Sequence, residues 1–362
     1  MRRYDRTVVK PIRVQAGERT YEVMVGSGLL RETGALIGEK LVGRACAVIS
    51  DDNVAGHFAD AVLASLKASG RRPTLITVPA GEESKTIERA GMICEKMSEA
   101  GLDRSSFVVA LGGGMIGDLA GFVAAIYHRG IPCVQVPTTL LAQVDSSIGG
   151  KTAVNTAAGK NLIGAWHQPV LVISDVDTLA TLPPREFRQG FAEIIKHAII
   201  RDAEMFEMLQ GSDQADLAAL IRRNVEIKAA IVAADERETT GERALLNFGH
   251  TIGHAIERAG EYRDFLHGEA VSLGIVAACE VSVWKAGLSD AERERIVRTL
   301  EKFELPTRLP TDFPKKKVQD AIRFDKKFSQ GAVRFVVVPK TGSARLATDV
   351  TIADLEAAVA LL

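Results

Sequence analysis

Three histidines in the second half of the chain have the residue type and spacing of a metal or substrate site. His250 and His254 lie in "NFGHTIGHAIE" and His267 follows in "FLHGEA", although the whole chain has only 7 histidines. On a helix, His250 and His254 would share one face, a single turn apart. The zinc-protease motif H-E-x-x-H is excluded, because Thr251 stands where that motif has its general-base glutamate.

A catalytic zinc site usually has three protein ligands and an open position for water or substrate. His250 and His267 are suitable nitrogen donors, and the third ligand is either His254 or a carboxylate such as Glu193 in "GFAEIIKHA". Lys196 lies one helical turn after Glu193, so an ordinary ion pair on a helix surface explains this carboxylate equally well. The residue types alone therefore do not decide whether Glu193 is a metal ligand or the partner of Lys196 in an ion pair.

A glycine-rich turn in the first half has the pattern of a phosphate-binding loop. In "FVVALGGGMIGDLAGF", Gly112, Gly114 and Gly117 satisfy G-x-G-x-x-G between a predicted strand and a predicted helix. Such a loop lets the backbone approach a pyrophosphate, whose charge the helix N-terminus favours. The acidic residue expected about twenty positions later is missing. The sequence therefore favours phosphate binding over a bare turn, but not an ordinary Rossmann fingerprint.

The segment "VPTTLLAQVDSSIGGKTAVNTAAGKNLIGAWHQP" (136–169) is the densest polar stretch of the chain. It combines Thr, Ser, Asp, Asn and Lys side chains with several glycines, and reads as a long loop. Loops of this length are usually functional or disordered, and its Leu, Ile, Val and Trp residues argue against disorder. We therefore expect it to bind a ligand.

The first half alternates short Val- and Ile-rich runs with helical periodicity, which predicts a mainly parallel sheet covered on both faces. The expected strands are 45–50, 74–79, 107–113, 133–137 and 170–174, and the expected helices between them include 84–100 and 117–127. After Pro183 the 3.6-residue period dominates, with helices expected at 186–210, 216–234, 244–259, 269–286 and 290–303 and one strand at 332–339. We expect an α/β domain with a Rossmann-like sheet at residues 1–180 and a mainly α-helical domain at 181–362.

Composition limits the function classes. The formal net charge is −1 and the pI about 6.7, so nothing in the overall charge favours nucleic acid as a partner. The four cysteines are scattered without a C-x-x-C pair, which argues against a thiolate zinc site or a disulfide framework. No signal-peptide pattern and no apolar run of membrane-spanning length is present. We expect a cytoplasmic protein without membrane association.

These motifs resemble, in order and spacing, those of the dehydroquinate synthase family of sugar phosphate cyclases. The resemblance runs from about Asp51 to Gly342 through "PAGEESK", "GGGMIGD", "RGIPCVQVPTTLLAQVDSSIGGKTAVN", "GKNLIGAWHQP", "TLPPREFRQGFAEIIK", "LNFGHTIGHAIE", "LHGEAV" and "DKK". It implies one divalent zinc or cobalt ion held by Glu193, His250 and His267. His254 would lie beside the substrate instead of binding the metal.

The resemblance also implies NAD as a cofactor. Its adenosine side would contact Asp51, Glu82 and Lys85, and its pyrophosphate and nicotinamide side Gly113, Gly114 and Asp118. The further cofactor residues that it implies are Met115, Thr138, Thr139, Leu141, Asp145, Lys160, Asn161, Thr178, Thr181, Leu182 and Glu186. Asp51 directly follows a predicted strand, where a carboxylate can accept hydrogen bonds from ribose hydroxyls, and so replaces the acid missing later.

The implied substrate is 3-deoxy-D-arabino-heptulosonate 7-phosphate, whose carboxylate and phosphate require cations. The matching positions are Arg129, Asp145, Lys151, Asn161, Lys196, Lys228, Arg243, Asn247, His254, Lys326 and Lys327. Catalytic roles are implied for Asp145, Lys151, Lys196, Asn247 and His254. The resemblance also implies a homodimer in which Arg129 reaches the neighbouring active site.

The reaction implied is a cyclisation without net redox change. NAD oxidises a carbinol of the substrate, phosphate leaves by β-elimination, the hydride returns, the ring opens, and an intramolecular aldol step gives 3-dehydroquinate. The substrate's own phosphate is implied as the base.

Three alternatives differ in what they predict. A polyol dehydrogenase of the glycerol type would accumulate NADH and typically has aspartate where Glu193 stands. Another sugar phosphate cyclase would differ around Leu246, Asn247 and His254, whose identities here favour dehydroquinate synthase. A non-catalytic nucleotide-binding protein would lack part of the metal set.

Overall fold

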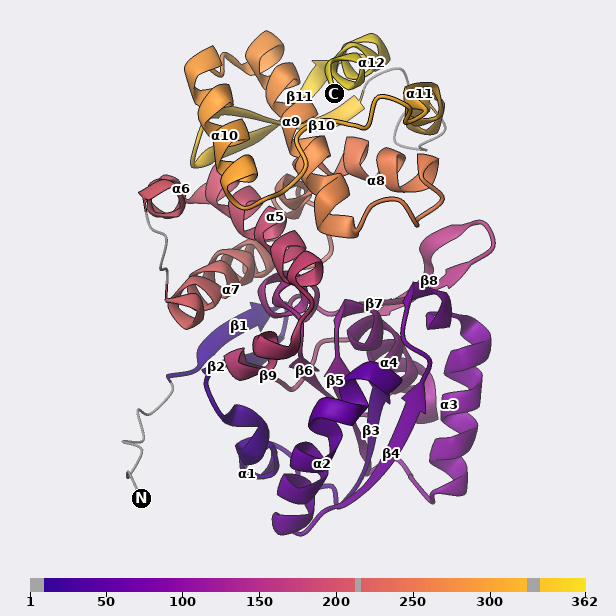
Figure 1. The fold of residues 1–362 in the computed structure, drawn as a ribbon. Coiled ribbons are helices and arrows are strands. Elements are labelled where there is room, and N and C mark those ends of the chain that lie inside the picture. The colour runs from indigo at the N-terminus through magenta and orange to yellow at the C-terminus, as the bar shows by residue number, and fades with distance from the viewer. Residues whose placement is uncertain (1–9, 212–215, 324–332) are drawn as a thin grey trace. The chain divides into compact units, whose positions relative to one another are not determined.

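A computed structural model of the chain describes residues 10–211, 216–323 and 333–362, and packing divides it into two units (Figure 1). The first unit contains the described residues up to Leu182 together with Leu217–Ala233. The second contains the described residues of Pro183–Asp216 and Ala234–Leu362. The sequence places the boundary between an NAD-binding and a metal-binding domain at residues 180 and 181. This functional division stays a prediction.

The first unit is built on a seven-stranded sheet of order β1-β2-β9-β6-β5-β3-β4. Only β1 is antiparallel to its neighbour, and the other pairs are parallel. The strands are β1 (Ile12–Ala16), β2 (Arg19–Gly26), β3 (Ala45–Asp51), β4 (Arg72–Val78), β5 (Phe107–Gly112), β6 (Cys133–Pro137) and β9 (Leu171–Asp175). Every residue of β5 and β6 is buried, as expected for strands with both faces covered.

Helices cover both faces of this sheet (Figure 1). On one face, Ala47 and Ile49 of β3 pack with α3 (Ile87–Glu99) and α4 (Gly114–Ile126). On the other, Cys46 and Val48 pack with α1 (Thr33–Gly38) and α2 (Asp52–Ala68). The alternation along β3 places two separate apolar cores against the sheet. The sequence prediction of a parallel α/β sheet is confirmed.

The polar segment between β6 and β9 is not the open loop that the sequence suggested. It contains a short π-helix, Ala142–Ser146, and an antiparallel hairpin of β7 (Lys151–Thr156) and β8 (Gly159–Trp166). Glycine and polar residues concealed the hairpin, because its strands lack the apolar alternation by which strands are recognised.

The second unit is mainly helical, with one antiparallel hairpin of β10 (Val333–Lys340) and β11 (Ser343–Val350). Its helices are α5 (Pro184–Arg201), α6 (Ala203–Gly211), α8 (His250–Ala259), α9 (His267–Ala286), α10 (Asp290–Lys302), α11 (Lys315–Arg323) and α12 (Ile352–Leu361). α7 (Leu217–Ala234) lies almost entirely in the first unit.

Three expectations for this half need correction. The helix expected at 186–210 is two helices, because the chain leaves helical geometry at Asp202 (φ −144°, ψ 84°). The helix expected from 244 starts only at His250, after a 3₁₀ turn at Arg243–Asn247 and a left-handed Gly249. A second strand, β11, accompanies the one strand that was expected.

Among the described residues, no helix combines the length and apolar character needed to cross a membrane. The cytoplasmic location expected from the sequence stays a prediction.

Candidate metal centre and nucleotide-binding loop

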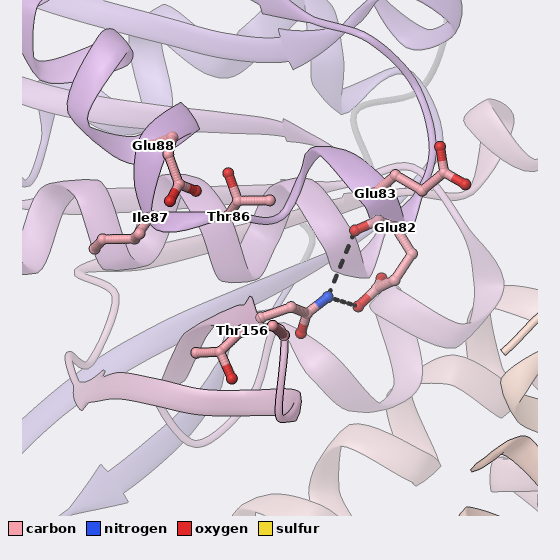
Figure 2. A pocket seen from close by; sticks show the side chains of 8 residues that line it. Glu82, Glu83, Thr86, Ile87, Glu88 and Thr156 are labelled. Carbon is pink, nitrogen blue, oxygen red and sulfur yellow. Dashed lines mark hydrogen bonds between the residues drawn. The ribbon is translucent and has the colours of Figure 1, made fainter. Parts of the chain in front are cut away.

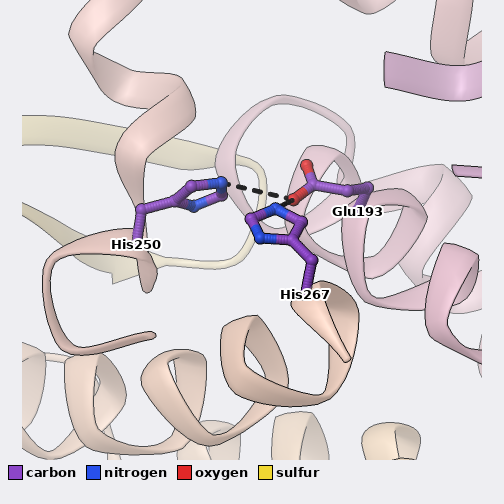
Figure 3. A group of neighbouring side chains, drawn as sticks. All are labelled: Glu193, His250 and His267. Carbon is purple, nitrogen blue, oxygen red and sulfur yellow. Dashed lines mark ion pairs between the residues drawn. The ribbon is translucent and has the colours of Figure 1, made fainter. Parts of the chain in front are cut away.

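Glu193, His250 and His267 converge in the second unit from three different helices (Figure 3). Nε2 of His250 lies 3.4 Å from Oε1 of Glu193, and Nε2 of His267 lies 3.8 Å from the same oxygen. Glu193 is completely buried, whereas the two imidazoles are partly exposed. One carboxylate and two imidazole nitrogens that face one another form a suitable donor set for a divalent zinc or cobalt ion.

Glycines allow the close helix approach that brings the two histidines together. A Cβ atom at Gly274 of α9 would lie 1.9 Å from the carbonyl oxygen of Gly249, directly before α8. A Cβ at Gly268 would lie 2.0 Å from the carbonyl oxygen of Gln189 on α5. Because glycine has no side chain at either position, the backbone of α9 can pack directly against α5 and the start of α8. His250 and His267 are the first residues of α8 and α9.

Side chains of α5 also fix the first turn of α9. Arg185 makes a bidentate pair with Glu269, with Nε–Oε1 and Nη2–Oε2 distances of 2.7 Å each. The carboxylate of Glu269 also accepts a hydrogen bond from the backbone N–H of Leu266, and Oε1 of Gln189 accepts one from Gly268 N–H. The helix that carries Glu193 therefore holds the helix that begins with His267.

The surroundings of the three side chains fit a metal ion. Nδ1 of His250 lies 3.2 Å from the carbonyl oxygen of Phe248, so the ring donates there and turns the Nε2 lone pair toward Glu193. Burial, with nearby Lys196 and the other histidines adding to it, lowers the pKa of His250 well below its usual value, which favours the neutral ligand form. Neither oxygen of Glu193 accepts a hydrogen bond from the described residues, although the Lys196 ammonium contacts Oε2. A buried carboxylate so poorly supplied with donors suits a cation.

His254 lies beside these residues without completing the group. Its ring centroid is 5.3 Å from that of His250 and 6.1 Å from that of His267, and its side chain is exposed. Lys196 is almost completely buried next to Glu193, so the expected pairing exists, but in the interior and not on a helix surface. The remaining second-unit positions are Glu186, which accepts a hydrogen bond from Gln189, the buried Arg243 and the half-buried Asn247.

The glycine-rich loop lies where β5 ends and α4 begins, in the first unit. A Cβ at Gly113 would meet Cγ2 of Thr139 at 3.0 Å, and one at Gly114 would meet Oγ of Ser146 at 3.0 Å. Gly113 is the residue before the 13-residue α4, so backbone N–H groups are available at a helix N-terminus. The hydroxyl of Thr138 is buried without a hydrogen-bond partner among the described residues, which leaves a donor and an acceptor for a ligand. These features fit a pyrophosphate.

Charged side chains surround the same end of the sheet. Asp51 ends β3, the strand next to β5, and its Oδ1 accepts hydrogen bonds from Asn53 and Val54 N–H at the start of α2. Because carboxyl ends of parallel strands meet at one edge, Asp51 and the glycine loop lie on the same edge of the sheet. The hydroxyl of Thr178 is occupied differently, since it donates to the carbonyl oxygen of Asp175.

Lys85 is buried between two carboxylates, 2.9 Å from Asp118 Oδ2 and 3.0 Å from Glu82 Oε1. Burial lowers the pKa of Lys85, but Asp118 and Glu82 outweigh burial and raise it, so the lysine is charged. Glu82 also accepts a hydrogen bond from the side-chain amide of Asn155, and Oδ1 of Asn155 accepts one from Asn161 N–H. Asn161 has a positive φ of 57°. Asn155 thus ties the β7–β8 hairpin, which carries Lys160 and Asn161, to the Lys85 cluster.

A pocket of about 360 Å³ opens beside this cluster (Figure 2). It is lined by Glu82, Glu83, Thr86, Ile87, Glu88, Asn155, Thr156 and Ala157. Glu82 is the predicted adenosine-side residue among them.

Other predicted cations of the first unit are distributed over several elements. Lys228 on α7 lies 2.5 Å from Oδ1 of Asp145, and Lys151 lies over the ring of Trp166, 5.5 Å from its centroid. Arg129 is exposed, with a positive φ of 70°. Met115, Leu141 and Leu182 are half-buried and Thr181 is exposed. Lys326 and Lys327 lie outside the described residues.

Several residues that contact the site residues were missed in the sequence, among them Asn155, Arg185, Gln189 and Glu257, whose Oε2 lies 3.4 Å from Nδ1 of His267. Only Glu257 had a usable signal, because it stands seven residues after His250 and three after His254, on the same helical face. The others act through partners distant in sequence, which periodicity does not reveal.

Two family models match the chain. The model described as 3-dehydroquinate synthase N-terminal matches residues 75–189, and the one described as 3-dehydroquinate synthase C-terminal matches residues 190–328. The chain belongs to the 3-dehydroquinate synthase family. A 3-dehydroquinate synthase of Symbiobacterium thermophilum is 46% identical over 347 residues, covering 93% of this chain and 96% of the relative. One of Rhizobium etli is 44% identical over 356 residues, covering 95% and 94%.

Solved structures share this fold, and two of them contain NAD⁺ and a divalent metal ion. A 2-epi-5-epi-valiolone synthase from Streptomyces hygroscopicus, with NAD⁺ and Zn²⁺ bound, has a TM-score of 0.86 and 30% identity, covering 97% of this chain and 99% of that chain. A 2-deoxy-scyllo-inosose synthase, complexed with carbaglucose-6-phosphate, NAD⁺ and Co²⁺, has a TM-score of 0.85 at 23% identity with the same coverage, which shows the fold. A probable glycerol dehydrogenase from Sinorhizobium meliloti shares the fold at 16% identity and a TM-score of 0.61, covering 94% of this chain and 95% of that one.

The predicted family, fold class, enzymatic nature and 3-dehydroquinate synthase function are confirmed. Individual cofactor, substrate and dimer assignments stay predictions.

Proposed function

We propose that the chain converts 3-deoxy-D-arabino-heptulosonate 7-phosphate to 3-dehydroquinate and phosphate, with NAD and one divalent zinc or cobalt ion as cofactors. The observation that carries the proposal is the group of buried Glu193 with partly exposed His250 and His267, in a chain that also has a glycine loop at a helix N-terminus. Residues 1–180 would hold NAD, and residues 181–362 would hold the metal and most of the substrate.

The bound cofactors supply reversible hydride transfer, from NAD, and Lewis-acid activation of a hydroxyl, from the metal. Glu193, His250 and His267 would hold the ion. Gly113, Gly114 and the buried Thr138 hydroxyl would bind the pyrophosphate, and Asp51 and the charged Lys85 cluster would hold the adenosine side. The remaining proposed cofactor residues are Glu82, Met115, Asp118, Thr139, Leu141, Asp145, Lys160, Asn161, Thr178, Thr181, Leu182 and Glu186.

The substrate would be bound by cations that the chain already holds in place. Nη1 of Arg243 donates to the carbonyl oxygen of Glu236, which orients the guanidinium, and Lys228 is fixed by Asp145. Lys196 would place its side chain beside Glu193 in the substrate site, and Asn247 and His254 would bind hydroxyl or phosphate oxygens. Lys151, Asn161, Lys326, Lys327 and Arg129 complete the proposed substrate set.

The test follows phosphate release and NADH absorbance in parallel, with the heptulosonate phosphate, catalytic NAD and zinc or cobalt. We expect stoichiometric phosphate without NADH accumulation, abolished by a chelator and by His250→Ala. Steady NADH formation from simple polyols without phosphate release would contradict the proposal and indicate a dehydrogenase. Phosphate release from a different sugar phosphate only would indicate another cyclase.

We further propose a homodimer in which Arg129 acts in the partner's active site. Its exposed position after a left-handed turn supports this role. Arg129→Ala and His250→Ala should each be inactive, but mixed subunits should recover about a quarter of the activity, because each heterodimer has one complete site. A mixture that stays inactive after verified subunit exchange would show that Arg129 acts within its own chain.

A further inference from the structure

The imidazole of His267 lies between two carboxylates. Nε2 faces Oε1 of Glu193 at 3.8 Å, and Nδ1 faces Oε2 of Glu257 at 3.4 Å. The side chain of Glu257 is 4% exposed, whereas that of His267 is 32% exposed. A buried carboxylate behind a half-buried imidazole is a specific arrangement, because such a carboxylate is rarely found without a partner.

The chemistry of the pair selects one tautomer of His267. An ionised carboxylate can only accept hydrogen bonds, so the ring proton must be on Nδ1. The lone pair of Nε2 then points toward Glu193. His250 has the same arrangement, with the Phe248 carbonyl oxygen in place of the carboxylate. Both histidines therefore present Nε2 to the same place, and both are oriented through Nδ1.

We propose that Glu257 is a positioning residue for the divalent metal: it fixes the tautomer and ring orientation of His267. This inference rests on the proposed metal site and adds a residue to it. A carboxylate behind a histidine ligand also makes the imidazole more basic and so a better donor to the metal. Neither the histidine spacing nor the expected ligand set includes this residue.

A second arrangement of the same side chains makes a different prediction. His254, Glu257 and His267 also have ligand atoms within 4.8 Å of one another, so Glu257 could bind an ion directly. In that case His267 would use Nδ1 and the exposed His254 would be a ligand. The positioning role is favoured because Nε2 of both His250 and His267 faces the completely buried Glu193.

The experiment compares cobalt binding by metal-free wild type, Glu257→Ala and Glu257→Gln, measured by competition with a chromophoric chelator. We expect about a 10- to 100-fold weaker affinity for Glu257→Ala. For Glu257→Gln we expect a smaller loss of roughly threefold or more, because the amide oxygen still accepts from Nδ1. Visible absorption of bound cobalt should change in both variants, since it reports ligand geometry. Glu294→Ala, which removes an exposed helical carboxylate, is the control and should bind cobalt as wild type does.

Affinity and cobalt spectrum unchanged in Glu257→Ala would overturn the proposal. If this variant does not fold, Glu257→Gln decides alone by the same criterion. A loss as complete as that in His250→Ala would also overturn it, because Glu257 would then be a ligand. His267→Ala separates this inference from the proposed metal site. If cobalt binding survives His267→Ala, the metal site itself is wrong; if only the Glu257 variants bind normally, the positioning role alone is wrong.

Discussion

Glu193 and Lys196 form an ion pair between two side chains that are almost completely removed from solvent. Transferring both charges from water is unfavourable, and removing one partner leaves the other charge buried without compensation. Such a pair contributes little net stability, yet breaking it is strongly destabilising. Its presence beside two imidazoles is explained better by function than by stability.

Glu193→Gln is expected to lower the free energy of unfolding of the metal-free protein by about 3 kcal/mol, because buried Lys196 loses the carboxylate that faces it. Adding Lys196→Met removes the buried amine and should recover at least half of the loss. Urea unfolding of both variants in a chelator measures the effect. A double variant less stable than the single one would contradict this account of the pair.

At the scale of elements, the approach of α9 to the start of α8 depends on glycine. Gly274→Ala would place a methyl group 1.9 Å from the Gly249 carbonyl oxygen, so the backbones must separate. We expect a loss of about 3 kcal/mol in unfolding free energy and weaker metal binding, as His250 moves relative to His267. Gly91→Ala in α3 is the matched control, since its Cβ meets no atom within 4 Å. Gly91→Ala should instead raise the unfolding free energy by about 0.5 to 1 kcal/mol. Normal metal binding by Gly274→Ala would refute the argument.

The loop after α7 is organised around the carboxylate of Asp235. Its oxygens accept hydrogen bonds from the backbone N–H groups of Thr239, Thr240, Gly241 and Arg243, at 2.8–3.2 Å. Burial raises the pKa of Asp235, but these donors, first among them Arg243 and Thr240, outweigh burial and lower it. The loop leads directly into the turn that carries Arg243 and Asn247.

Asp235→Asn should therefore have a pH-dependent effect on stability. A carboxyl group whose pKa is lowered in the folded state stabilises the protein above its unfolded pKa of about 4, and this contribution is lost as the pH falls. We expect the variant to be about 2 kcal/mol less stable near pH 7, with the difference shrinking below about pH 4. Urea unfolding across this range, with exposed Asp349→Asn as the control, measures it. If the difference in unfolding free energy between wild type and Asp235→Asn grew as the pH falls, this account of Asp235 would be contradicted.

Sequence patterns identified the elements whose position depends on their own residues and not on distant packing partners. β5 and β6 were found because their apolar runs are covered on both faces, and the ends of β6 were predicted without error. The periodicity of 186–210 continued across Asp202, so the break between α5 and α6 was missed. The convergence of Glu193 with His267 depends on helix packing through Gly268 and Arg185, which no local pattern encodes. Residue types alone left Glu193 and His254 open as the third ligand, and the family resemblance chose Glu193.

At the scale of the whole molecule, the metal and the fold are thermodynamically linked. An ion that binds only the folded protein adds about 2.7 kcal/mol to the unfolding free energy when its free concentration is about 100 times its Kd. Zinc should therefore raise the Tm of metal-free wild type, and a chelator should reverse the change. His250→Ala should show no such rise. An equal rise in this variant would mean that zinc stabilises the protein from another site.

The chain passes between the two units three times, after Leu182, Asp216 and Ala233. During synthesis on the ribosome, the first unit therefore lacks α7, and with it Lys228, until part of the second unit has already emerged. Domains generally fold as units during synthesis, so we expect the first unit to complete its fold only after α7 has been synthesised. A single proteolytic cut after Leu182 would likewise release a fragment without Lys228. The order of the segments along the chain therefore prevents a single cut from separating the two units intact.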